Sequence, residues 1–124
     1  MSNNINEKNP FDYFVDVFKK YAVFNGRSRR AEYWYFALFS TIISILLEII
    51  SFFVLKNLII VYLYDLAVLI PGLAVSIRRV HDIGKSGWFI LINLIPIVGF
   101  IIWIVYMATD SQPGENKYGQ NPKI

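Results

Sequence analysis

Three long apolar runs constrain this chain of 124 residues more than any other feature. They are Trp34–Leu55, Leu58–Ile77 and Trp88–Thr109, with 20 to 22 residues each. At about 1.5 Å of rise per residue, a helix of that length crosses a hydrocarbon core about 30 Å thick. A soluble chain of this size could bury one such helix but could not surround three. We therefore predict an all-α polytopic membrane protein whose transmembrane domain, residues 34–109, contains three transmembrane helices.

The composition supports the same class of protein. Hydrophobic residues make up 56% of the chain and charged residues 17%, whereas about 25% of an ordinary soluble domain is charged. The chain has no Cys, which excludes disulfides and thiolate metal sites. We expect membrane lipids as partners, with a second copy of the chain or another membrane protein as alternatives, and neither nucleic acid nor a cofactor.

A short helix is predicted within the N-terminal region, residues 1–33. Asn9 can cap this helix, Pro10 suits its first position, and Asn25-Gly26 supplies a left-handed stop. A charged helix of about 15 residues is too short to span a bilayer. We expect this amphipathic helix to lie flat in the membrane interface, with its aromatic side in the lipid.

The positions of Lys and Arg predict the orientation of the chain. Six of these residues precede Trp34 and three lie in Arg78–Lys85, whereas one is Lys56 and two follow Thr109. With three spans, nine positive charges fall on the side of the N-terminus and three on the other side. Because positive charges stay in the cytoplasm, we expect a cytoplasmic N-terminus in the bacterial inner membrane.

The third apolar run leaves two topologies open, because Asn93, Pro96 and Gly99 interrupt it at mid-depth. A kinked full span is favoured, since broken backbone exposed to lipid is costly. That arrangement would place the polar tail, residues 110–124, outside the cell. A re-entrant hairpin that turned at these residues would instead return the tail to the cytoplasm.

Two basic segments flank the first pair of spans and predict a site for an anionic ligand. One precedes the first span, and the other links the second span to the third, beside a helix start that Ser86 can cap. Arginines beside a helix N-terminus favour phosphate or carboxylate, and lipid headgroups are the nearest such ligands. The alternative is that the charges only fix the topology. The predicted site comprises Arg27, Arg29, Arg30, Arg78, Arg79, Lys85 and Ser86.

The same segments lack the parts of a catalytic or metal site. Gly84-Lys85-Ser86 is not a phosphate-binding loop, because that motif requires Gly at the position that Arg79 occupies. His81 is the only histidine, so neither a catalytic triad nor a metal site can be assembled from the usual residues. We expect a protein that is not an enzyme.

Three segments together resemble a known family. Phe24–Trp34, Arg78–Trp88 and Pro113–Gly119 are similar to the opening, central and tail signatures of the bacterial inner-membrane family catalogued as domain of unknown function 805. The resemblance implies a small polytopic protein of the cytoplasmic membrane and no established reaction. It also implies that the motif residues act jointly; beyond the basic residues these are Gly26, Glu32, Tyr33, Trp34, His81, Asp82, Gly84, Gly87, Trp88, Gly114, Asn116, Tyr118 and Gly119.

Glu48 and Asp65 are the only acids within the apolar runs. Each lies eight residues from the Lys56-Asn57 turn, so both sit about 12 Å below it. A carboxylate near the centre of a span costs about 3 kcal/mol. Facing each other, the two would share a proton or hold a cation; facing apart, they would reach separately toward the headgroups. The alternative function is therefore a subunit of an oligomeric small transporter or channel.

Overall fold

The computed structural model describes residues 9–122, and its regular elements are all helical in this range. The predicted all-α class is confirmed. In chain order the elements are the helix α1 (Pro10–Lys19), the helix α2 (Arg30–Ile50), the π-helical turn η1 (Ser51–Leu55), the helix α3 (Ile59–Asp82), the 3₁₀ helix η2 (Gly87–Leu94) and the helix α4 (Val98–Met107).

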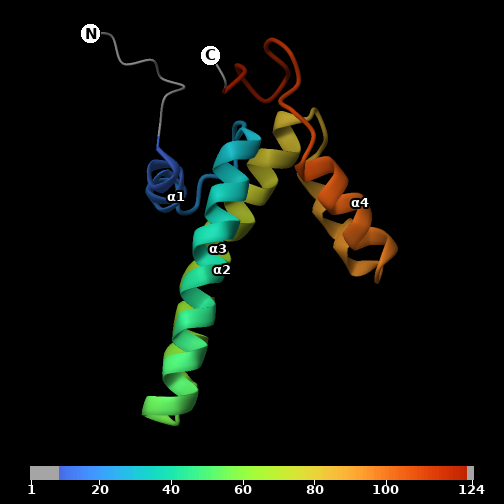
Figure 1. Ribbon diagram of the computed structural model, residues 1–124. Coiled ribbons are helices and arrows are strands. Elements are labelled where there is room, and N and C mark those ends of the chain that lie inside the picture. Colours follow the sequence, from blue (N-terminus) through green and yellow to red (C-terminus); the bar gives the residue numbers. More distant parts are fainter. Residues whose placement is uncertain (1–8, 123–124) are drawn as a thin grey trace, which may run out of the picture.

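The helices α2 and α3 form a long hairpin, with α1 and α4 gathered near one end of it (Figure 1). Counted with η1, the first arm has 26 residues and the second has 24, so both are long and apolar enough to cross a membrane. The chain reverses at Lys56 and Asn57, where the Asn57 side chain accepts a hydrogen bond from the Ile59 N–H at 2.8 Å. We call this the turn end, and we call the opposite end, which holds Arg30 and Asp82, the polar end.

The helix α3 continues five residues beyond the predicted limit of its apolar run at Ile77 and passes through Pro71. The sequence predicts that the central charged residues lie in a link between two spans, and that placement is wrong for most of them. Because they occupy the last turns of a helix, their side chains point in fixed directions toward neighbouring elements. The residues concerned are Arg78, Arg79, His81 and Asp82.

The helix α1 begins as predicted but is shorter and faces a different environment. The Asn9 side chain accepts the Asp12 N–H at 3.0 Å, and Pro10 occupies the first turn. The helix ends at Lys19, well before the predicted stop at Asn25-Gly26. Its buried side chains Phe14 and Val17 pack in one cluster with residues of α2 and α3. The expectation that the aromatic side lies in lipid is therefore wrong for this face, because the hairpin supplies a protein surface for it.

The prediction of a third full-length helix is wrong, because residues 88–109 form a hairpin. The 3₁₀ helix η2 ends at Leu94, the chain turns through Pro96 and Ile97, and α4 returns beside η2. Ile97 adopts a φ of 63° at this turn, a value that a β-branched residue rarely takes. Gly99 faces the carbonyl of Ile92 so closely that a Cβ there would collide with it. Both ends of the third run consequently lie at the polar end (Figure 1).

Substituting Gly99 tests the hairpin. Gly99→Ala should lower the free energy of unfolding by about 1–3 kcal/mol, because the added Cβ forces the two arms of the hairpin apart. The matched control is Gly72→Ala in α3, whose Cβ would meet only the Phe36 ring at an ordinary 3.6 Å. Thermal unfolding of the purified variants in detergent gives the comparison. Equal melting temperatures for the two variants would contradict the packing of α4 on η2.

Candidate functional site

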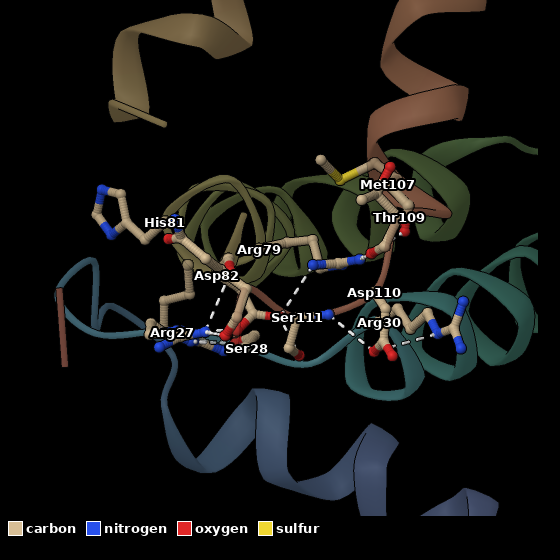
Figure 2. A network of polar contacts seen from close by, with 12 residues as sticks. Arg27, Ser28, Arg30, Arg79, His81, Asp82, Met107, Thr109, Asp110 and Ser111 are labelled. Atoms are coloured by element: carbon tan, nitrogen blue, oxygen red, sulfur yellow. Dashed lines mark hydrogen bonds and ion pairs between the residues drawn. The ribbon is translucent and has the colours of Figure 1, made fainter. Parts of the chain in front are cut away.

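The three sequence motifs converge at the polar end, although they are far apart in the chain. Figure 2 shows residues of the opening and central motifs together with the start of the segment that follows α4. The opening motif comes from the loop before α2, the central motif from the end of α3, and the tail motif from the segment after α4. Charged side chains fill the space between them, and each is at most 7% exposed. These buried side chains are Arg27, Glu32, Arg78, Arg79 and Asp82.

Asp82 lies at the centre of this cluster, between two guanidinium groups. Arg27 donates from Nε to its Oδ1 atom at 3.0 Å, and Arg79 donates from Nη1 to its Oδ2 atom at 3.0 Å. The Ser111 hydroxyl donates to the same Oδ2 atom. A carboxylate removed from water is stable only when such charge-assisted bonds replace its hydration. Asp82 therefore joins α3, the loop before α2 and the tail.

Arg27 holds the tail through its remaining N–H groups. Its Nη1 atom donates to the carbonyls of Gly114 at 2.7 Å and Gly119 at 3.2 Å, and Nη2 donates to the carbonyl of Gln112 at 2.6 Å. A planar guanidinium carries five donors in a fixed fork, so one side chain can hold several carbonyls at once. The fold of the tail is thus set by a residue about 90 positions earlier in the chain.

Arg79 holds the end of α4. Its Nη2 atom donates to the carbonyl of Met107 at 3.1 Å and also to that of Thr109. Trp34 donates from its indole Nε1 to the same Met107 carbonyl at 2.9 Å. The last carbonyls of a helix lack intrahelical partners and attract positive charge. These contacts draw the third apolar run back to the polar end.

A second buried ion pair organises the segment between α1 and α2. Arg78 donates from Nη2 to Glu32 at 3.2 Å, from Nε to the Ser28 hydroxyl at 2.8 Å, and from Nη1 to the Val23 carbonyl at 2.7 Å. Lys20 adds a contact of 3.4 Å to Glu32. Ser28 also donates to Glu32. These bonds hold residues 20–29 against α3, which accounts for the early end of α1.

His81 contacts both the loop before α2 and the tail, and it does not form an acid–base pair with Asp82. Its Nδ1 atom lies 3.0 Å from the Gly26 carbonyl, and its ring stacks on Tyr118 with centroids 4.0 Å apart. Asn116 donates to the His81 backbone carbonyl at 3.0 Å. His81 and the tail residues of the motif therefore have structural partners.

Four of the predicted anion-binding residues lie outside the buried cluster. Arg30 is half exposed, approaches Asp110 at 3.8 Å and donates to the Ala108 carbonyl at 3.2 Å. Arg29 lies over the Tyr13 ring. Lys85 lies over the rings of Phe89 and Tyr106 at the base of the hairpin that η2 and α4 form. Ser86 caps η2 as predicted, because its side chain accepts the Trp88 N–H at 3.4 Å.

Burial therefore divides the residues of the predicted anionic site into two groups. Arg27, Arg78 and Arg79 point inward to carboxylates and backbone carbonyls. By contrast, Arg29 and Arg30 line an open cleft with a volume of about 390 Å³. The other residues that line this open cleft are Ala31, Trp34, Tyr35 and Asp110.

Ser111 and Gln112 are not among the predicted site residues, but they contribute a hydroxyl and a carbonyl to the cluster. The only signal for them was their position in a polar turn directly after an apolar run, which does not distinguish them from ordinary turn residues. Glu32 was included in the opening motif without a role, and the structure gives it one as the partner of Arg78. The intramembrane acids Glu48 and Asp65 line a common groove near the turn end.

Comparison with known proteins gives the family. Residues 21–120 match the family described as protein of unknown function (DUF805). The chain belongs to this family. Inner membrane protein YhaI of Escherichia coli (strain K12) is 37% identical over 113 residues, which are 90% of this chain and 96% of that protein. Inner membrane protein YhaH of the same organism is 37% identical over 122 residues, or 91% and 98% of the two chains. No solved structure matches.

The region matched by DUF805 contains every element that builds the buried cluster, whereas α1 precedes it. The resemblance inferred from three short motifs is thereby confirmed over most of the chain. Two long apolar helices and relatives that are inner membrane proteins together support an integral membrane protein.

Replacing Arg27 tests whether it holds the tail. Arg27→Lys keeps a positive charge beside Asp82 but loses the fork that reaches three tail carbonyls, so we expect tryptic cleavage at Lys117 to accelerate by about tenfold or more. The control, Arg30→Lys, makes the same change at a half-exposed arginine and should leave the cleavage rate near that of the wild type. Mass spectrometry of the released peptide gives the rate. Equal protection of the tail in Arg27→Lys and wild type would exclude this role.

Proposed function

We propose that this protein is a non-enzymatic, multi-pass protein of the bacterial inner membrane that binds anionic phospholipid headgroups at its cytoplasmic face. In this proposal α2 and α3 cross the membrane, and η2 and α4 form a re-entrant hairpin that enters and leaves from the cytoplasmic side. The binding site is the open cleft lined by Arg29 and Arg30, which we call the headgroup-facing cleft. The buried arginine cluster holds the surrounding elements in place and does not contact the lipid.

The distribution of positive charge supports this orientation. Once the third run returns to the polar end, nine of the ten Lys and Arg residues within residues 9–122 belong to segments at that end, and only Lys56 lies at the turn end. Such an asymmetry is typical of a cytoplasmic polar end, and it is larger than the eight-to-two split that three full spans would give for the same residues.

The observation that carries the ligand assignment is the composition and position of the headgroup-facing cleft. Arg29 and Arg30 open onto it where α2 begins, and Trp34 and Tyr35 line it one turn later. A helix N-terminus carries partial positive charge, and the forked guanidinium binds two phosphate oxygens at once. Trp and Tyr are enriched at the depth of lipid headgroups. If the arginines held the phosphate of a phospholipid, the acyl chains of that lipid would therefore lie along α2.

The ion pair at the cleft favours exchange with a ligand. Arg30 and Asp110 are separated by 3.8 Å, and both side chains are about half exposed. Exposed ion pairs contribute little to stability. A phosphate group can therefore replace Asp110 as the partner of Arg30 without disrupting the fold, whereas the buried pairs of Arg27 and Arg79 would be costly to break.

The two-span topology predicts the labelling of single cysteines, which can be introduced into a chain that has none. In intact cells an impermeant thiol reagent should label Lys56→Cys. Gln120→Cys, in the tail, should be labelled only after the inner membrane is permeabilised. Labelling of Gln120→Cys in intact cells would instead indicate three full spans and would exclude the re-entrant hairpin.

Headgroup binding is tested by neutralising the cleft. The double variant Arg29→Gln, Arg30→Gln should retain about tenfold less anionic phospholipid through purification, measured by native mass spectrometry. The control Lys19→Gln, Lys117→Gln removes the same charge from exposed positions outside the cleft. Arg29→Lys, Arg30→Lys should be intermediate, since a point charge cannot bind two oxygens in a plane. If the two Gln variants retained equal amounts of lipid, the cleft would not be the binding site. Its charges would then serve only to orient the protein in the membrane.

A further inference from the structure

A groove between α2 and α3 near the turn end combines two acids with an apolar lining. Its volume is about 630 Å³, within the 300–1,000 Å³ range of small-molecule sites. Glu48 of α2 and Asp65 of α3 both line it, together with aliphatic and aromatic side chains that include Phe52 and Tyr62. The groove lies at the opposite end of the hairpin from the headgroup-facing cleft.

Both carboxyl groups lie within the apolar helices and lack a basic partner. Among residues 9–122 neither Glu48 nor Asp65 forms an ion pair. A carboxylate in hydrocarbon is unfavourable without a countercharge. Two such groups opening onto one groove therefore constitute a site with a strong preference for positive charge.

A buried hydroxyl provides an independent indication of a ligand. Ser51 is fully buried, and its Oγ atom has no hydrogen-bond partner among the described residues. It lines a second cavity of about 560 Å³ together with Lys56 and Asn57, and this cavity shares Phe52, Phe53 and Leu58 with the acidic groove. Leaving a buried hydroxyl unpaired is unfavourable. The π-helical turn η1 begins at Ser51, and such turns are frequent at functional sites.

The lining selects among the cations that could enter. Among the described residues no three His, Asp or Glu side chains come together as a metal site would require, and the apolar lining offers few further oxygen ligands to complete the coordination of a metal ion. Aromatic rings attract organic cations through their faces, and Phe52, Phe53 and Tyr62 lie around the acids. The apolar body of such a ligand would cover these rings and the aliphatic lining residues in place of lipid chains. The chemistry therefore fits an organic cation with an apolar body better than a metal ion.

We propose that this groove binds a lipophilic organic cation through Glu48 and Asp65, with Ser51 as a supporting polar contact in the adjoining cavity. This site is separate from the proposed headgroup cleft, and it gives a substrate class to the alternative function as a subunit of a small transporter. The ligand reaches the groove laterally from the membrane, because the groove opens between the two spanning helices.

Binding of tetraphenylphosphonium to the full-length protein tests this proposal. The protein is reconstituted in nanodiscs of zwitterionic phosphatidylcholine, and bound probe is measured by equilibrium dialysis against empty nanodiscs. We expect saturable binding by the wild type and a loss of affinity of about tenfold or more in Glu48→Gln, Asp65→Asn. The matched control, Glu115→Gln, removes an acid from the exposed tail and should bind as the wild type does. Ser51→Ala should weaken binding less than the double variant.

The outcomes separate the proposal from simpler explanations. Uptake equal to that of empty nanodiscs, or equal binding by the wild type and the double acid variant, would overturn it. Equal affinity for the uncharged triphenylphosphine oxide would also overturn it, because the site would then be merely apolar. If Tyr62→Cys instead forms a disulfide between two copies and the probe does not bind, a second copy covers the groove and the proposal fails. None of these results depends on Arg29 or Arg30, so the headgroup proposal stands or falls separately.

Discussion

The rest of the structure depends on the two ion pairs that the buried carboxylate of Asp82 forms with Arg27 and Arg79. Through these two arginines Asp82 connects the last turn of α3 to the loop before α2, the end of α4 and the tail. Each group in the cluster is removed from water, so each requires a partner, and removing one would leave another charge uncompensated. The cluster therefore forms as a unit, and four segments of the chain must reach the polar end together.

This requirement decides the path of the third apolar run. A continuous helix from Trp88 to Thr109 would carry its end about 30 Å from its start. Arg79 would then lose the carbonyls of Met107 and Thr109, and Arg27 would lose the tail. The turn at Pro96 and Ile97 has a local cost in backbone strain. The charge-assisted bonds at the polar end, together with the indole bond of Trp34 to Met107, offset that cost.

Arginine serves two different purposes at the polar end, and burial separates them. Arg27, Arg78 and Arg79 use the guanidinium fork internally, where one side chain satisfies several carbonyl or carboxylate oxygens. Arg29 and Arg30 face an open cleft at the start of α2. The same residue type in the same short motif thus lies inside the buried cluster at one position and lines an open cleft two positions later. Charge content alone does not distinguish these roles.

The sequence by itself determined the all-helical class, the two long apolar helices, the Lys56-Asn57 turn, the start of α1 at Asn9 and Pro10, and the membership of the family. These features follow from local properties: run length, capping chemistry and ordered motifs. Only the tertiary structure decided that the third run is a hairpin, that α1 packs on protein, and which arginines are buried. Those outcomes depend on partners such as Arg27 with Gln112 and Arg79 with Thr109, which lie 85 and 30 positions apart. A local pattern shows that a charged group is present, but its partner is settled only when distant segments compete for the same buried hydrogen bonds.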